Sequence, residues 1–187
     1  MLILVAGGPG AGKTVLGRAL AQNIPESVLL DKDVAASSWV DALLSVLNEG
    51  QVDRDSDIYW RSVRPLEYAS LMALAMDNLA LQKSVVVVAP FLVELADPLW
   101  TANLRTTVTE LGARLAILWI ETDAASARIR MTRRDDSRDA WKLSHWDQFV
   151  GSARFSPPTD GFVVLRNGEH ATLSDVLDQA LAHLKSL

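Results

Sequence analysis

Residues near the start of the chain have the types and the spacing of a phosphate-binding loop. Residues 7–14 read Gly-Gly-Pro-Gly-Ala-Gly-Lys-Thr and satisfy the pattern G-x-x-x-x-G-K-[ST]. Glycines let backbone N–H groups converge on phosphate oxygens, and a following helix presents its positive N-terminus to the same anion. Lys13 is expected to bridge the β- and γ-phosphates, and the Thr14 hydroxyl to ligand Mg²⁺. The motif therefore predicts binding of ATP or GTP, with contacts from Gly8, Pro9, Gly10, Ala11, Gly12, Lys13, Thr14 and Val15.

The sequence around the loop supports this interpretation. An apolar run at residues 2–6 precedes it, and a helical pattern made by Val15, Leu16, Ala19 and Leu20 follows it. The alternative is a glycine-rich turn that binds nothing. The strand before the loop and the helix after it favour the phosphate loop.

Two carboxylates follow the second predicted strand. Asp31 and Asp33 are expected at the carboxyl edge of the sheet, beside the phosphate loop. A carboxylate there could accept a proton from an attacking hydroxyl. The alternative is that Asp33 caps a helix beginning near Val34, and one residue can serve both purposes.

A short segment further along is rich in arginine. Arg128, Arg130, Arg133, Arg134 and Arg138 lie within eleven residues. Helical spacing cannot place all five on one face, so some must be exposed or ion-paired. Arginines on a closing lid neutralise a transferring phosphoryl group. The alternative is a solvated face paired with Asp135, Asp136 and Asp139.

The third predicted strand ends in Val88-Ala89-Pro90-Phe91 and lacks the acidic residue that GTPase switches and mechanical ATPases use to organise metal and water. Phe91 fits either the floor of an acceptor pocket or ordinary packing. The charged stretch 51–64, with Arg54, Tyr59 and Trp60, fits either an acceptor-binding segment for a sugar-like or amine-bearing compound or a solvated loop.

The remaining pattern alternates strands and helices. Continuous apolar runs predict buried strands at 2–6, 27–30, 84–89, 115–120 and 162–165. Helical spacing is clearest for Leu66, Ala69, Met72, Ala73, Met76, Leu79 and Ala80, and for Leu173, Val176, Leu177, Ala180, Leu181 and Leu184. This alternation predicts an α/β fold with a parallel sheet in one domain spanning 1–187.

Composition excludes several function classes. The chain has 187 residues, a net charge of −5 and no cysteine. Absence of cysteine removes thiolate chemistry and Cys-ligated metals, and it fits a reducing compartment, so we expect the cytoplasm. The acidic balance disfavours nucleic acid as a partner. No apolar run reaches the roughly 20 residues of a membrane span. The three histidines lie too far apart in the sequence to form a metal-ligand pair. The sequence does not indicate an oligomeric state.

Four segments together resemble a known family. They are the loop Gly7 to Thr14, the element Leu30-Asp31-Lys32-Asp33, residues 85–91, and the arginine-rich segment. They are similar to small P-loop kinases that phosphorylate metabolite hydroxyls, such as gluconate kinase, adenylylsulfate kinase and chloramphenicol phosphotransferase. The similarity extends to zeta-toxin-like and AAA-labelled bacterial P-loop kinases, and it covers nearly the whole chain. It implies a three-layer P-loop NTPase fold, with a five-stranded parallel sheet ordered 2-3-1-4-5, helices on both faces and an Arg-rich lid.

The resemblance also implies roles for individual residues. Asp33 takes the position of the base, and Asp31 holds Mg²⁺ through water or orients the acceptor. Lys32 stands where the relatives often carry Gly, so the two roles can be exchanged. Arg130, Arg134 and Arg138 become the lid arginines, in a lid at about 124–152. Residues 34–65 become the acceptor side, and Asn167 lies where backbone passes over the adenine ring.

The expected function is transfer of the γ-phosphate of ATP, with Mg²⁺, to a hydroxyl of a small molecule of sugar, nucleoside or antibiotic type. One alternative is a polynucleotide 5′-hydroxyl kinase. Such an enzyme needs a basic channel, which a net charge of −5 disfavours. Another is a non-catalytic ATP-binding regulatory module, which the missing acid on the third strand favours.

Overall fold

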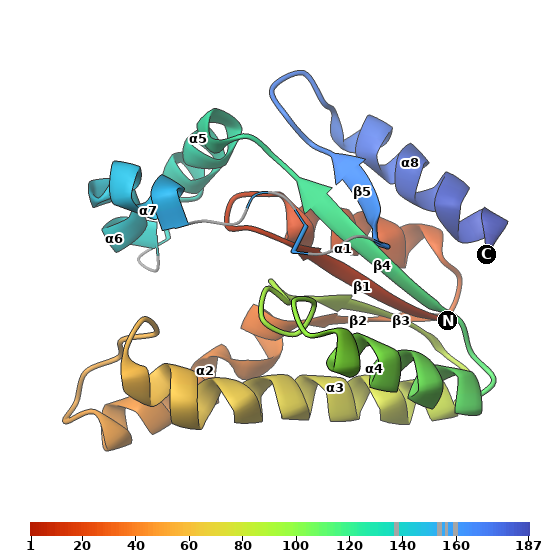
Figure 1. Ribbon diagram of the computed structural model, residues 1–187, viewed down its shortest axis with the longest axis horizontal. Helices are drawn as coiled ribbons and strands as arrows, with labels where there is room; N and C mark the ends of the chain where they lie inside the picture. Colours follow the sequence, from red (N-terminus) through yellow and green to blue (C-terminus); the bar gives the residue numbers. More distant parts are fainter. Residues whose placement is uncertain (137–138, 153–154, 156, 159–160) are drawn as a thin grey trace.

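A twisted parallel sheet forms the centre of the protein in the computed structural model, which describes residues 1–136, 139–152, 155, 157–158 and 161–187. Its strands are β1 (Leu2–Gly7), β2 (Ser27–Asp31), β3 (Ser84–Val88), β4 (Leu115–Glu121) and β5 (Val163–Arg166). All pairings are parallel, and the order is β2-β3-β1-β4-β5 (Figure 1). The predicted fold class and strand order are confirmed, and each strand end lies within one residue of its predicted position.

Burial on both faces explains why the strand sequences are continuously apolar. In β1, Leu2 and Leu4 point into one core, while Ile3 and Val5 point into the other. Alternate side chains of a strand point to opposite faces, so two covered faces require apolar residues at every position. The edge strand β2 is only half-buried over most of its length.

Two layers of helices cover the sheet. α1 (Lys13–Asn23) and α8 (Leu173–Ser186) pack on one face, and α3 (Arg64–Ala80) and α4 (Pro98–Glu110) on the other (Figure 1). α2 (Lys32–Leu47) packs beside α3 and the π-helical turn η1 (Tyr59–Val63). The chain therefore has a small third core under the acceptor-side segment.

Three short helices stand beyond the carboxyl end of the sheet. They are α5 (Ala124–Arg134), α6 (Ala140–Ser144) and α7 (Trp146–Ser152), and they lie together on the left of Figure 1. Asp123 caps α5 by accepting a hydrogen bond from the Ser126 backbone N–H at 2.7 Å. These helices occupy the segment expected as a lid, and below they are called the lid helices as a name for this position only.

The apolar pattern predicted the buried face of α8 well and that of α3 poorly. In α8, Val176, Ala180 and Leu184 are buried as expected. In α3, Leu66 is 53% exposed, whereas the charged residues Arg64 and Glu67 are buried. The rule that apolar residues face inward fails there because both charged residues have buried ionic partners.

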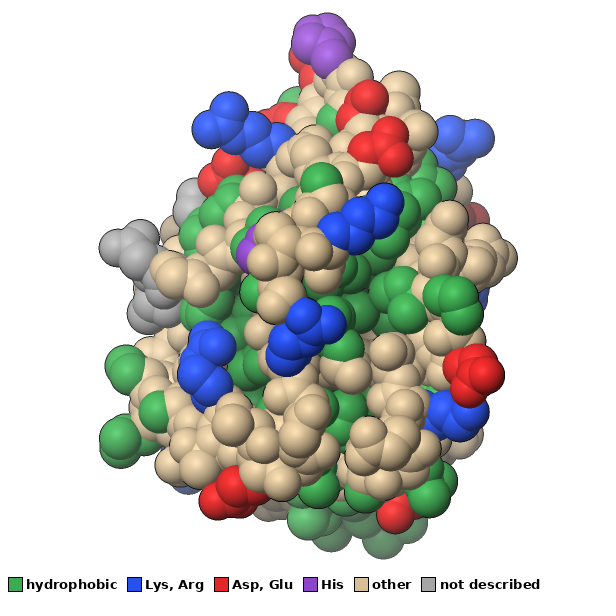
Figure 2. Space-filling model, turned by 90° about the vertical axis from the view of Figure 1, so that its right-hand side faces the viewer, with side chains coloured by type: hydrophobic (Ala, Val, Ile, Leu, Met, Phe, Trp, Pro, Cys, Tyr) green, Lys and Arg blue, Asp and Glu red, His purple; other side chains and the backbone are tan. Residues whose placement is uncertain are grey.

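The Lys and Arg side chains on the face that carries both chain ends do not gather into one patch (Figure 2). Lys and Arg side chains on that face are separated by hydrophobic and polar surface, and acidic groups lie among them (Figure 2). Among the described residues, no helix is both long and apolar enough to cross a membrane.

Candidate active site

The phosphate loop lies against the lid helix α5 and the residues after β5. Gly10 has φ +72°, and a Cβ there would come within 2.7 Å of the Ala127 carbonyl oxygen. Gly12 has φ +95°, and its Cβ would come equally close to the Asn167 side-chain nitrogen. Both positions therefore require glycine, because a side chain would be strained and would collide with a neighbouring element.

Lys13 folds back over the loop. Its Nζ donates to the Gly8 carbonyl oxygen at 2.8 Å. Burial lowers the pKa of Lys13 from 10.5 to about 8, although the nearby carboxylates of Asp33 and Asp31 raise it. Arg134 lowers the same pKa, so the positive charge of this lid arginine acts at the loop.

Asp31 joins the phosphate loop to α2. Its Oδ2 accepts from the Thr14 hydroxyl at 2.9 Å, and its Oδ1 accepts from the Asp33 backbone N–H at 3.0 Å. Asp31 is therefore the N-cap of α2, and the expectation that Asp33 caps a helix near Val34 is wrong. The helix begins earlier because Asp31, at the end of β2, already satisfies the backbone donor of the first turn. Asp33 lies inside the first turn, and its partly exposed carboxylate lies beside Lys32.

The pair Thr14 and Asp31 fits Mg²⁺. A hydroxyl and a carboxylate already within hydrogen-bond distance are the hard oxygen donors that this ion prefers. Mg²⁺ normally keeps several waters and phosphate oxygens, so two protein ligands suffice. Across the described part of the chain, no group of three or more His, Cys, Asp and Glu residues forms an all-protein metal cage.

A network of ion pairs and hydrogen bonds connects Asp33 to the protein interior. Lys32 Nζ is 3.3 Å from Asp33 Oδ1 and donates to Glu67 Oε1 at 2.8 Å. The Tyr59 hydroxyl donates to Glu67 Oε2 at 2.7 Å. Glu67 is fully buried, so its charge depends on these two partners and on Arg54, whose Nη1 lies 3.9 Å from Glu67 Oε1. The π-helical turn that begins at Tyr59 brings the ring to Glu67, and neither Glu67 nor this turn was singled out from the sequence.

Arg130 ties three segments together. Its guanidinium donates to the Thr122 hydroxyl at 2.9 Å, to the Asn167 carbonyl oxygen at 3.0 Å and to the Gly10 carbonyl oxygen at 3.4 Å. Asn167 donates its side-chain amide to the Ala11 carbonyl oxygen at 2.7 Å. Arg130 and Asn167 thus hold the phosphate loop from behind. The assignment of Arg130 to the transferred phosphoryl group stays a prediction.

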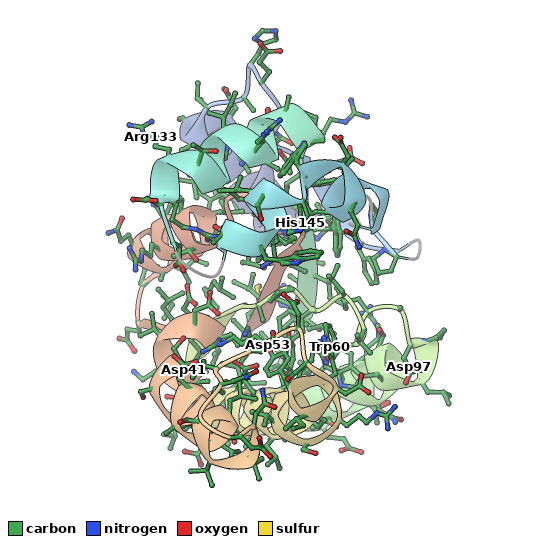
Figure 3. All side chains as sticks on the ribbon, turned by 90° about the vertical axis from the view of Figure 1, so that its left-hand side faces the viewer. Asp41, Asp53, Trp60, Asp97, Arg133 and His145 are labelled. Atoms are coloured by element: carbon green, nitrogen blue, oxygen red, sulfur yellow. The ribbon has the colours of Figure 1, made fainter. Side chains whose placement is uncertain are left out.

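The other arginines of the lid have different surroundings. Arg134 forms an ion pair with buried Asp139, and Arg128 lies over the Trp146 ring at 5.3 Å. Arg133 points outward from α5 (Figure 3). Arg138 lies outside the described residues. The expectation that the five arginines cannot share one face is consistent with these separate environments.

Two groups of aromatic side chains lie on opposite sides of the carboxyl edge. Trp141 stacks on His145 in the lid, with ring centroids 4.9 Å apart. Trp60 and Asp53 lie on the acceptor side, and His145 is above them in the view of Figure 3. Trp60 and Trp141 are each nearly half exposed, which is unusual for tryptophan. Phe91, by contrast, is fully buried against Tyr68, in agreement with the packing alternative.

A sizeable cavity lies away from these residues. It measures about 780 Å³ and is lined by α4 and by Gly161 and Phe162. None of its lining residues belongs to the phosphate loop, to β2 or to the lid helices. The candidate active site is therefore distinct from this cavity.

The fold is shared with solved structures of small kinases. A putative kinase from Chloroflexus aurantiacus aligns with a TM-score of 0.64 at 22% identity, over 99% of this chain and 96% of that one. A gluconokinase from Sinorhizobium meliloti aligns with a TM-score of 0.59 at 17% identity, over 99% of this chain and 91% of that one. The APS kinase from Mycobacterium tuberculosis, solved with AMPPNP and APS, aligns with a TM-score of 0.52 at 16% identity, over 98% of this chain and 96% of that one. At these identities the likeness shows the fold alone.

Family membership follows from the sequence itself. No curated protein matches the chain. The family model AAA_33, described as an AAA domain, matches residues 2–158. This range contains the phosphate loop, both strand-two carboxylates and the three lid helices. The chain is a P-loop protein that belongs to this AAA domain family.

Proposed function

We propose that the protein transfers the γ-phosphate of Mg-ATP to a hydroxyl group of a small molecule. The observation that carries the proposal is the contact between Thr14 and Asp31 beside Lys13, with Asp33 on the next turn of chain. Phosphoryl transfer depends mainly on positioning and on neutralising charge, and these residues supply both. The kinase names of the structural neighbours point in the same direction.

Each residue has a defined task in this scheme. Lys13 and the loop amides would bind the phosphates, and Thr14 and Asp31 would hold Mg²⁺, which would supply charge neutralisation for the transfer. Asp33 accepts the proton of the acceptor hydroxyl as the oxygen of that hydroxyl forms a bond to the γ-phosphorus. The bond from that phosphorus to the β–γ bridging oxygen breaks, and ADP leaves. Arg134 adds positive charge from the lid side.

One observation favours a second candidate, a regulatory module that binds ATP without transferring phosphate. The strand β3 ends without a carboxylate, and the next one along the chain, Glu94, is bound by Arg64 in two hydrogen bonds of 2.8 and 2.9 Å. Glu94 is therefore committed to Arg64 rather than to a metal. Thr14 and Asp31 already offer a hydroxyl and a carboxylate to a metal ion, so we prefer the kinase.

Acceptor-dependent release of ADP tests the proposal. The panel contains sugars, sugar acids, nucleosides, aminoglycosides, chloramphenicol and an oligonucleotide with a 5′-hydroxyl, each with Mg-ATP and with Mg-GTP. We expect at least one small molecule to accelerate ADP release, and the Lys13→Met variant to abolish that acceleration. ATP binding without acceleration by any acceptor would favour the regulatory module, and activity with the oligonucleotide alone would favour the polynucleotide kinase.

A further inference from the structure

Most of the net negative charge of the chain lies in the segment that contains Asp33. Residues 31–67, here called the acceptor wall, run from Asp31 through α2 and η1 to Glu67 at the start of α3. They contain eight carboxylates and four cationic side chains, and thus supply four of the five net negative charges of the protein. Asp33 belongs to this wall, and Lys32 links it to the buried carboxylate of Glu67.

The buried cations of the acceptor wall are already paired. Lys32 lies between Glu67 and Asp33, at 2.8 and 3.3 Å. Arg64 binds Glu94 through both of its terminal nitrogens and also lies over the Tyr68 ring. A buried pair of this kind is costly to break, because the carboxylate left behind has no water to replace its partner.

The two remaining cations of the wall are paired as well. Arg54 Nη2 donates to Asp41 Oδ1 at 2.7 Å and its Nη1 lies 3.9 Å from Glu67. Arg61 is near the Asp57 carboxylate, at 3.7 Å, where both side chains are exposed. Every Lys and Arg of the acceptor wall therefore has a carboxylate partner within 4 Å.

None of the four arginines of α5 offers an unpaired cation to the acceptor side. Arg134 is paired with Asp139, Arg128 lies over Trp146, and Arg130 faces backbone oxygens of the phosphate loop and Asn167. Arg133 points away from Asp53 and Trp60 (Figure 3). Within the described residues, the cations of the acceptor wall thus face carboxylates, and Arg128, Arg130 and Arg134 face an aromatic ring, backbone oxygens and a carboxylate.

We propose that the acceptor carries no net negative charge, and that it is a neutral polyhydroxylated compound or a hydroxyl compound bearing an amine. This inference rests on the proposed function. An anionic acceptor would have to break an existing pair or lie unpaired near carboxylates. Neutral hydroxyls can donate hydrogen bonds to those carboxylates, a cationic amine is attracted by them, and apolar faces can stack on Trp60.

Fractionation by charge tests the inference even while the acceptor is unidentified. A protein-free metabolite extract of the source organism is separated at pH 7 on an anion exchanger into retained and unretained fractions. Each is incubated with the full-length protein and Mg-ATP labelled at the γ-phosphate, and label in new compounds is counted. The Lys13→Met variant, purified in the same way, corrects for contaminating kinases.

The three outcomes separate the inference from the proposed function. We expect at least about tenfold more label from the unretained fraction, which holds neutral and cationic compounds. More label from the retained fraction would overturn the charge assignment and leave the kinase intact. Label from neither fraction, in a protein that binds Mg-ATP, would overturn the proposed function and with it the inference. The accepted compound is then compared with an analogue carrying a carboxylate or phosphate, which we expect to react at least about tenfold more slowly.

Discussion

At the scale of single residues, the lowered pKa of Lys13 makes nucleotide binding depend on pH. The ammonium form binds phosphate, and burial places its pKa at about 8 in the free protein. Above that pH the protein must take up a proton to bind Mg-ATP, so we expect the dissociation constant to rise by up to about tenfold per pH unit. Isothermal titration calorimetry from pH 7 to 9.5 measures it, and buffers of different ionisation enthalpy report the proton taken up.

The same shift has an opposite effect on the stability of the free protein. The unfolded chain keeps the ordinary pKa of 10.5, so it binds more protons than the folded chain between about pH 8 and 10.5. The contribution of Lys13 to the free energy of unfolding therefore rises across this window. Lys13→Arg keeps its charge and should show neither dependence, whereas a flat dissociation constant in the wild type would contradict the pKa.

Replacing Asp33 by asparagine tests the base. We expect acceptor-dependent kcat to fall by about 10²–10⁴-fold, because the amide cannot take the proton, with ATP affinity within about twofold of wild type. Asp31→Asn is the matched comparison. It should weaken Mg²⁺-dependent ATP binding, because Asp31 touches Thr14. Full turnover by Asp33→Asn, with loss of turnover in Asp31→Asn, would exchange the two roles.

At the scale of elements, Arg130 is the link between α5, the phosphate loop and the turn after β5. Its hydrogen bonds to Gly10, Thr122 and Asn167 hold the loop in the shape that receives phosphate. We expect Arg130→Gln to weaken Mg-ATP binding by at least about tenfold, the cost of losing charged hydrogen bonds. Equilibrium binding of a fluorescent ATP analogue measures this.

Arg133→Gln is the control for that variant, since Arg133 lies on the same helix and points outward. Its binding should match the wild type, and circular dichroism should show both variants folded. Equal losses in the two variants would mean that the general positive charge of α5 matters rather than the link made by Arg130.

At the scale of the whole molecule, nucleotide binding should stabilise the fold. The loop contacts β4 through Gly7 and α5 through Gly10, and its Ala11 carbonyl oxygen accepts a hydrogen bond from Asn167 in the turn after β5. A nucleotide bound at the loop therefore stabilises elements from both halves of the chain. At a concentration one hundred times its dissociation constant, Mg-ATP should add about 2.7 kcal/mol to the free energy of unfolding. For a chain of this size that raises Tm by about 5–10 °C.

Differential scanning fluorimetry of the wild type and Lys13→Met measures this effect. The variant should show less than about a tenth of the rise, because it lacks the cation that binds phosphate. An equal rise in both proteins would place the nucleotide away from Lys13.

Sequence alone determined the parts that depend on local pattern. The loop motif requires its glycines for backbone reasons, and a strand buried on both faces must be apolar throughout, so the phosphate loop and all five strands could be located. The resemblance added the strand order. Asp31 and Asp33 were placed at the right edge because parallel strands end together.

Which side chains meet depends on how the elements pack in three dimensions. Glu67 and Arg64 look like surface residues of α3, yet their partners Lys32, Tyr59 and Glu94 come from other segments, up to 35 residues away. The division of labour between Asp31 as helix cap and Asp33 as the carboxylate beside Lys32 likewise depends on where α2 begins. The local sequence pattern indicates which face of its own element a residue lies on. Ionic pairing between elements depends instead on how those elements pack against one another.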